Sequence, residues 1–346
     1  MTITWPSADQ RLERSYRRLL LAYPRQYRHR HGTEIVTTLL ELAAPGQHRP
    51  DRAEAWHLLA SGVRQRFRLP AGRPLALAFA VLMTLIGGAL GAAAGSWSGV
   101  QTFADLPDGA ALTQQAAGPG ESESLVHDDS PWSAASVHGS TQVTGTWDIE
   151  RSRQRLEAGG WDVDAVNSLD GTAAVYDPDT GTTIIPLHNG QFEARKNGVT
   201  MSVQASLTVD GGSVDVAAWA DTTPALLPLI LTGMVAGLLA GWLFAAAAAY
   251  RIVRSRRTVT TAILAGTAAA VLVLPAVALY GNLMRAFRYA GNTGPVFTVH
   301  NAFNPGPYYP FGPHWQVLAL AIAGTVLVSV ALLLARPGPH PLRQAA

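Results

Sequence analysis

The sequence predicts an integral membrane protein with four α-helical spans. A small all-α domain precedes the first span, and an α+β domain, an antiparallel sheet with one helix, separates the first span from the second. Three observations predict this fold class. Four long segments are apolar and uncharged. The composition is 48% hydrophobic and only 14% charged, too apolar for an ordinary soluble chain of 346 residues. The net charge of +2 is the sum of basic regions, such as residues 1–74, and an acidic region at residues 98–224.

The first apolar segment, residues 75–97, contains no charged residue. A helix of this length extends about 34 Å, enough to cross the hydrocarbon core of a bilayer. Similar segments follow at 225–250, 259–280 and 315–335, and Pro275 predicts a kink in the third span. Because the four segments contain no Asp, Glu, Lys, Arg or His, the sequence argues against a channel or transporter that acts alone.

Charge is distributed unevenly along the chain. Residues 1–74 contain 13 arginines and six acidic residues, whereas residues 98–224 contain 18 acidic and five basic residues. Arginines lie before the first span, between the second and third, and after the fourth: Arg64, Arg66, Arg68, Arg73, Arg251, Arg254, Arg256, Arg257 and Arg336. By the positive-inside rule, these regions face the cytoplasm.

We therefore expect a multi-pass protein of a bacterial plasma membrane with both termini in the cytoplasm. The loop at 251–258 and the tail at 336–346 then lie inside, and the acidic domain lies outside. Since membrane orientation accounts for the arginines, we expect the lipid bilayer, and no nucleic acid, as their partner.

Residues 1–74 predict the cytoplasmic helical domain. Ser7 and Gln10 form a capping box before a helix with one apolar face. Pro24 begins a short second helix that we expect to end at Gly32. A further helix starts at Thr33, and Asp51 with Glu54 caps the last one.

This N-terminal region also carries a recognisable pattern within residues 11–68. The pattern is Tyr16-x-x-Leu19-Leu20-x-x-Tyr23-Pro24-x-x-Tyr27-Arg28-x-x-x-Gly32-x-Glu34-Ile35. It resembles the permease-prefix segment that precedes the first span of bacterial membrane proteins, including uncharacterised actinobacterial proteins often encoded beside PadR-type regulators. The resemblance implies a cytoplasmic helical module of signalling or unknown role. Arginine is used everywhere except at Lys196, which also suggests the GC-rich genome of an actinobacterium.

The region between the first two spans divides into two parts. Residues 98–145 contain few bulky apolar residues and predict a flexible extracytoplasmic linker. Residues 146–224 predict the α+β domain, in which Asp148 caps a helix over 149–158. Apolar and polar residues then alternate over 199–209, and Asp210-Gly211-Gly212 predicts a hairpin turn.

Glycines recur at every fourth position in two spans. Gly87, Gly91 and Gly95 lie in the first, and Gly233, Gly237 and Gly241 lie in the second. Such ladders allow helix backbones to approach closely. Packing between helices of one chain is the simpler interpretation. Contact with a second copy or another protein, through one ladder or through the outer domain, is the alternative.

The sequence lacks residues that the common catalytic and metal sites require. It has no cysteine, which excludes disulfides and thiolate metal sites. Lys196, the only lysine, lies in no P-loop, and no G-x-S-x-G motif occurs. We therefore expect no enzymatic activity, no cofactor and no metal.

Three short motifs have ordinary explanations. Asp179-Thr180-Gly181 matches the aspartic-protease triplet, and with Asp177 it faintly resembles a calcium loop. A second triplet is missing, and His188 stands where the calcium loop needs an acid, so a turn is the better interpretation. His29 with His31, and His127 with Asp128 and Asp129, lack a third metal ligand at useful spacing.

The outer loop at 281–314 is rich in aromatic residues and proline. Such aromatic residues usually lie at the level of the lipid headgroups. A docking surface is the alternative, in which Arg285 and Arg288 face the acidic domain.

Together, these features predict a non-enzymatic membrane protein. It couples an extracytoplasmic acidic domain to a cytoplasmic helical module in a sensory, regulatory or scaffold role. The alternative is a subunit of an ATP-driven export or mechanotransmission complex, because FtsX-like and MacB-like permeases have a similar order of spans. Those permeases use an acidic coupling segment after the second span, whereas residues 251–258 contain no acid.

Overall fold

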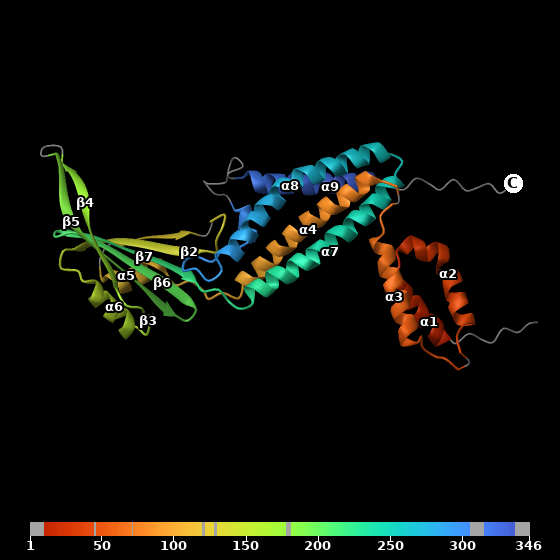
Figure 1. Ribbon diagram of the computed structural model, residues 1–346, viewed down its shortest axis with the longest axis horizontal. Coiled ribbons are helices and arrows are strands. Elements are labelled where there is room, and N and C mark those ends of the chain that lie inside the picture. The colour runs from red at the N-terminus through yellow and green to blue at the C-terminus, as the bar shows by residue number, and fades with distance from the viewer. Residues whose placement is uncertain are drawn as a thin grey trace, which may run out of the picture. The chain divides into compact units, whose positions relative to one another are not determined.

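The computed structural model describes residues 10–44, 46–70, 72–119, 122–127, 130–177, 181–304 and 315–335 (Figure 1). The chain forms two compact units. One comprises residues 1–85, 239–269 and 327–346, and the other comprises 86–238 and 270–326. The four longest helices, described next, are each divided between the two units.

Four helices among the described residues are long and apolar enough to cross a membrane. They are α4 (Pro74–Val100), α7 (Leu226–Val253), α8 (Thr258–Arg288) and α9 (Gln316–Leu334). The exposed leucine, isoleucine and valine side chains along these helices suit contact with lipid. Helix α8 continues through Pro275 and eight residues beyond the predicted end of the third span. The first part of the predicted 281–314 loop is therefore helical.

The N-terminal helices are α1 (Gln10–Leu19), the 3₁₀ turn η1 (Leu20–Ala22), α2 (Arg25–Glu41) and α3 (Arg52–Phe67). They enclose a small core of Leu12, Tyr16, Leu20, Tyr23 and Val36. The Tyr16 hydroxyl donates a hydrogen bond to Glu54 Oε2 at 2.8 Å. Burial, together with this carboxylate, raises the pKa of Tyr16 to about 12.

Two expectations for this domain need comment. The predicted helix end at Gly32 is wrong, because α2 runs through this residue to Glu41. Glycine inside a helix costs only about 1 kcal/mol relative to alanine, which packing can offset. The helix expected after Asp51 is confirmed, although the Asp51 side chain makes no capping hydrogen bond. Ser7 lies outside the described residues.

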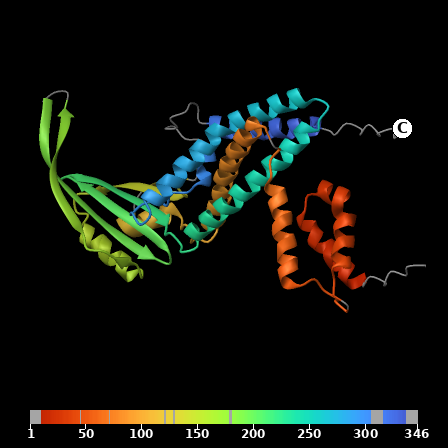
Figure 2. The ribbon, with the colours of Figure 1, turned by 45° about the vertical axis from the view of Figure 1, so that its right-hand side comes forward.

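The middle of the chain forms a seven-stranded antiparallel sheet with the order β1-β2-β7-β6-β5-β3, in which β4 also pairs with β5. The strands are β1 (Ser122–His127), β2 (Ser136–Thr144), β3 (Asp162–Val163), β4 (Asn167–Asp177), β5 (Gly181–Lys196), β6 (Val199–Leu207) and β7 (Gly211–Ala220). Figure 2 shows the β4–β5 hairpin extending away from the rest of the sheet.

The turns between strands follow local chemistry. Asn197 and Gly198 connect β5 to β6 with φ angles of 53° and 77°, the left-handed conformation that two-residue hairpin turns require. The predicted hairpin at 210–212 is confirmed between β6 and β7. The residues between Asp177 and Gly181, including Asp179 and Thr180, lie outside the described residues.

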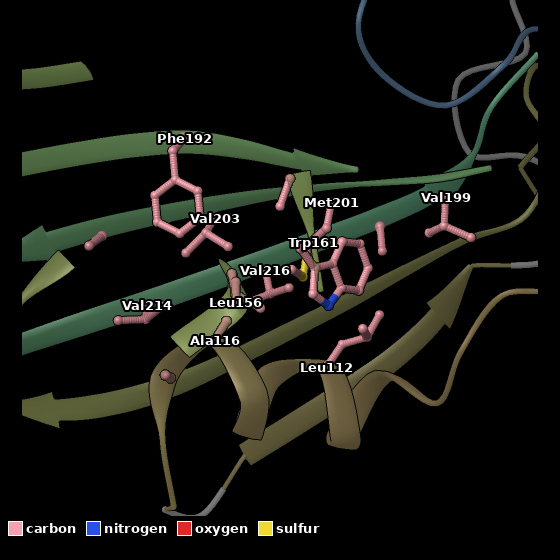
Figure 3. Packing of buried hydrophobic residues seen from close by; sticks show 14 residues of the cluster. Leu112, Ala116, Leu156, Trp161, Phe192, Val199, Met201, Val203, Val214 and Val216 are labelled. Atoms are coloured by element: carbon pink, nitrogen blue, oxygen red, sulfur yellow. The ribbon is translucent and has the colours of Figure 1, made fainter. Parts of the chain in front are cut away.

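Helices α5 (Gly109–Ala117) and α6 (Ile149–Ala158) cover one face of the sheet. Leu112 and Ala116 of α5 and Leu156 of α6 pack on strand residues such as Met201 and Val216 (Figure 3). The predicted helix over 149–158 is confirmed, and the Asp148 carboxylate accepts a hydrogen bond from the Glu150 amide at 3.0 Å.

The expected flexible linker at 98–145 is wrong, and so is the expectation of a single helix. This segment contains α5, β1 and β2, and β2 pairs with the central strand β7. The reason is that small residues make this part of the core. Ala116 and Ala117 are buried, and Thr113 lies so close to Gly139 of β2 that no Cβ would fit there. The low content of bulky apolar residues therefore predicts a linker where the chain forms a packed layer of small residues.

Candidate functional site

The two glycine ladders face each other between α4 and α7. A Cβ atom at Gly91 would lie 2.9 Å from the Cα atom of Gly237 and closer still to the Gly233 carbonyl oxygen. Gly237 meets the backbone of Gly87 in the same way, and Gly95 meets the Leu229 backbone. Gly241 contacts the backbone of Met83. We call this contact the glycine seam, and it is made within one chain.

Several of the predicted orientation-determining arginines also hold helices together. The Arg66 guanidinium donates to the carbonyls of Leu21 and Ala22, each at 2.6 Å, and so ties α3 to η1. Arg251 Nε donates to the Ala335 carbonyl at 3.1 Å. The remaining described members are Arg64 and Arg68 near the end of α3, Arg73 before α4, and Arg254, Arg256 and Arg257 around the α7–α8 turn. Arg336 lies outside the described residues.

A buried polar junction connects α8 to the segment that leads into β2. Asn282 of α8 is only 1% exposed. Its side-chain amide donates to the carbonyl of Pro131 at 2.8 Å and to that of Thr298 at 3.1 Å. The side-chain amide of Asn301 donates to the Ser130 carbonyl at 3.1 Å and also to that of Ser133. Asn282 within α8 and Asn301 after it therefore both bond the short segment 130–133.

Backbone pairing reinforces this junction. The amide of Ala134 donates to the carbonyl of Val296 at 2.8 Å, and the amide of Thr298 donates to that of Trp132 at 2.8 Å. Residues Ser133 and Phe297 form an antiparallel bridge. Since residue 136 begins β2, the strand that enters the sheet is anchored to the chain that follows α8.

Helix α4 joins the same junction through Ser96. Its side chain is fully buried, and its Oγ atom accepts a hydrogen bond from the Val299 amide at 2.9 Å. His300 Nδ1 lies 3.1 Å from the same Oγ atom. Burial lowers the pKa of His300 to about 4, so the imidazole is neutral near pH 7. The hydrogen bonds that Ser96, Asn282 and Asn301 make to backbone groups of the junction are thus all between neutral groups.

The arginines at the end of α8 contact aromatic rings. The Arg285 guanidinium lies 5.8 Å from the centre of the Trp132 ring, and Arg288 lies 5.7 Å from that of Tyr289. Neither arginine forms an ion pair with the described acidic residues. Arg285 therefore contacts the segment before β2 through an aromatic ring. Most of the proline-rich part of the loop lies outside the described residues.

The other sequence candidates are not brought together. His31 lies 3.4 Å from Glu34, its neighbour on α2, and His29 lies in the same helix. The side chain of His127 and residues Asp128 and Asp129 are not described. Within the described ranges, the structure contains no cluster of three residues suited to hold a metal ion.

Sequence reasoning did not identify the residues of the junction. Asn282 interrupts an apolar run near the end of the third span, and Ser96 lies near the end of the first. A polar side chain in an apolar helix indicates that this side chain forms a specific hydrogen bond. The partners themselves are backbone carbonyls at residues 131 and 298, which no side-chain motif marks.

The fold and the site define a class: a protein with four apolar helices suited to a membrane and an antiparallel sheet domain covered by helices. Comparisons with protein-family models, curated proteins and solved structures gave no match for this chain.

Proposed function

We propose that this chain is a non-enzymatic plasma-membrane protein that couples an extracytoplasmic domain to a cytoplasmic helical module, in a sensory, regulatory or scaffold role. The distribution of arginine supports placing both termini inside and the acidic domain outside. Such a protein needs a mechanical connection between its outer domain and its spans.

The observation that carries this proposal is the buried polar junction. A displacement of residues 130–135 would break the hydrogen bonds that Asn282 and Asn301 make to this segment. A buried group left without its hydrogen-bond partner costs about 1–3 kcal/mol. Moving α8 and α4 together with the sheet avoids this cost, so the junction favours concerted motion.

The inner parts of the helices offer a matching contact. Trp242 of α7 donates its indole N–H to the Phe67 carbonyl, the last residue of α3, at 3.0 Å. Arg66 holds the same turn of α3 to η1. Because α4 and α7 pack along the glycine seam, a shift of α4 at Ser96 would move α7 as well. Through Trp242, α7 would then move α3 of the N-terminal domain.

Hydrogen–deuterium exchange of the full chain in lipid nanodiscs tests the coupling. We expect Asn282→Ala to raise exchange in residues 130–138 and also in α3 and the inner part of α7. Gln204→Ala, an exposed change on the β6 strand, is the control and should alter neither region. Changes confined to the outer segments would refute the coupling.

The orientation has a direct test because the chain contains no cysteine. A cysteine introduced at Gly171, on β4, should react with a membrane-impermeant maleimide in intact cells. One introduced at Ala53, on α3, should react only after permeabilisation. The reverse pattern would overturn the proposed orientation.

The permease alternative keeps one supporting observation, the order of one long helix, a sheet domain and three further long helices. The connection between α7 and α8 speaks against it, because only residues 254–257 separate the helices and none is acidic. Co-purification of a stoichiometric ATPase with the full chain would favour the alternative, and its absence from crosslinked membranes would favour the first proposal.

A further inference from the structure

A second site lies in the unit that contains the N-terminal helices. A cavity of about 840 Å³ opens between α2, α3 and the inner part of α7. Six arginines line it: Arg25, Arg28, Arg30, Arg66, Arg251 and Arg254. Of the described residues that line it, none is acidic. This volume lies within the range of small-molecule sites, about 300–1,000 Å³.

The six arginines divide into two sets. Arg66 and Arg251 bond backbone carbonyls, and Arg254 lies 5.9 Å from the centre of the Tyr250 ring. By contrast, the side chains of Arg25, Arg28 and Arg30 form no hydrogen bond or ion pair with other residues in the described part of the chain. The Nε atom of Arg28 is buried and has no acceptor there. These three arginines lie on the first two turns of α2, and no acidic residue that the structure describes forms an ion pair with them.

The start of α2 adds to the positive potential. Pro24 occupies the N-cap position, no side chain caps the helix, and its first turn contains no acid. Pro24 and Arg25 line the cavity, so the positive end of the helix dipole lies at its wall. His31 also lines it and lies 3.4 Å from Glu34, the one carboxylate with which these α2 residues form an ion pair in the described part of the chain.

The remaining wall of the cavity is apolar. Leu243, Ala246 and Ala247 of α7 contribute it, and they belong to a helix that is apolar enough to cross the membrane. A free anion would make no use of such a wall. A molecule with a phosphate group and a hydrocarbon chain would use both surfaces.

We propose that this basic cavity binds the phosphate group of an anionic phospholipid. The guanidinium groups of Arg25, Arg28 and Arg30 bind the phosphate oxygens through charge-assisted hydrogen bonds, for which the planar fork of arginine is suited. The acyl chain lies along Leu243 and Ala247 of α7. Basic pockets beside membrane helices on the cytoplasmic side bind anionic headgroups in this way. A lipid bound there would therefore connect α2 to α7 across the cavity that both helices line.

The test uses the purified full chain in detergent, with bound lipid counted by native mass spectrometry. The probes are phosphatidylglycerol, phosphatidylcholine and sodium pyrophosphate. We expect the wild type to bind phosphatidylglycerol in preference to phosphatidylcholine. Arg25→Gln with Arg30→Gln should weaken this binding at least tenfold. Arg18→Gln with Arg52→Gln removes the same charge from exposed positions outside the cavity and should leave binding unchanged.

A second variant separates the cavity from the charge. Ala247→Trp fills the apolar wall at an exposed position and keeps every arginine. We expect it to reduce phosphatidylglycerol binding at least tenfold with an unchanged melting temperature.

Three results would overturn the proposal: equal loss of binding in the control pair, equal binding of phosphatidylcholine, or pyrophosphate binding as tightly as phosphatidylglycerol and unaffected by Ala247→Trp. The last result would assign the arginines to a free phosphate ligand.

Discussion

The glycine seam allows a sharp test of how the spans pack. In Gly91→Ala, the added Cβ would lie 2.9 Å from the Cα atom of Gly237 and still nearer the Gly233 carbonyl oxygen. Contacts between unbonded carbon atoms prefer about 3.5–4.0 Å, so α4 and α7 must separate by several tenths of an ångström or more. Overpacking of this kind typically lowers the free energy of unfolding by about 1–3 kcal/mol. Gly91→Leu should cost more, because the larger leucine side chain would meet the same backbone atoms of α7, which cannot change rotamer to make room.

The chain supplies a matched control for this experiment. Gly266 lies inside α8, and a Cβ there would meet no atom within 4 Å. Gly266→Ala should therefore be neutral or slightly stabilising, because alanine favours a helix over glycine by about 1 kcal/mol.

The assay is the apparent melting temperature of the purified chain in one detergent, measured for both variants and the wild type. With an unfolding entropy of about 2.1 cal/mol/K per residue, a cost of 1 kcal/mol shifts the melting temperature of this 346-residue chain by about 1.4 °C. We expect Gly91→Ala to melt a few degrees lower and Gly266→Ala to melt at or above the wild-type temperature. Equal melting of the two variants would refute the close packing of α4 on α7.

Three further predictions concern the junction and the two folded domains. Asn282→Ala leaves two carbonyls without their donor and should destabilise the chain by about 1–3 kcal/mol, seen as a lower melting temperature. The folded state lowers the pKa of His300 to about 4 and therefore favours the neutral imidazole. The stability of the fold that depends on this neutral imidazole is fully present above pH 6.5 and is lost as the pH falls toward 4. Melting between pH 7 and pH 4 should thus change less in His300→Gln than in the wild type. Because the pKa of Tyr16 is raised to about 12, the N-terminal domain should lose stability between pH 10 and 12, and Tyr16→Phe should abolish this loss in circular dichroism titrations.

The four long helices could be predicted closely because hydropathy is a local property that adds along the chain. No predicted end of the first, second or fourth span differs from the structure by more than a few residues. Helix α8 is the exception, since it continues through Asn282 and Arg285 to Arg288. Polar residues normally suggest a helix end near the membrane surface. Here Asn282 bonds the neighbouring segment and accepts a hydrogen bond from Arg285 on the same helix, and the helix continues.

The sheet domain was predicted only in part. Strand β6 and its hairpin with β7 have strict alternation and a strong turn signal, so they were predicted correctly. The sequence predicts a linker where α5 and β2 lie because most of the buried positions of these two elements hold small residues such as alanine, threonine and glycine. Close contacts such as Thr113 against Gly139 make these small residues a core, and this closeness depends on residues distant in the sequence.

The sequence by itself determined the long apolar helices, the opposite charge of the flanking and intervening segments, and the glycine spacing, because each of these is set by neighbouring residues in the chain. Tertiary structure alone decided that the two glycine ladders meet each other, that Asn282 and Ser96 hold the segment entering β2, and that arginines from three helices share one cavity. These contacts join residues far apart in the chain, many of them through backbone carbonyls that carry no side-chain signature.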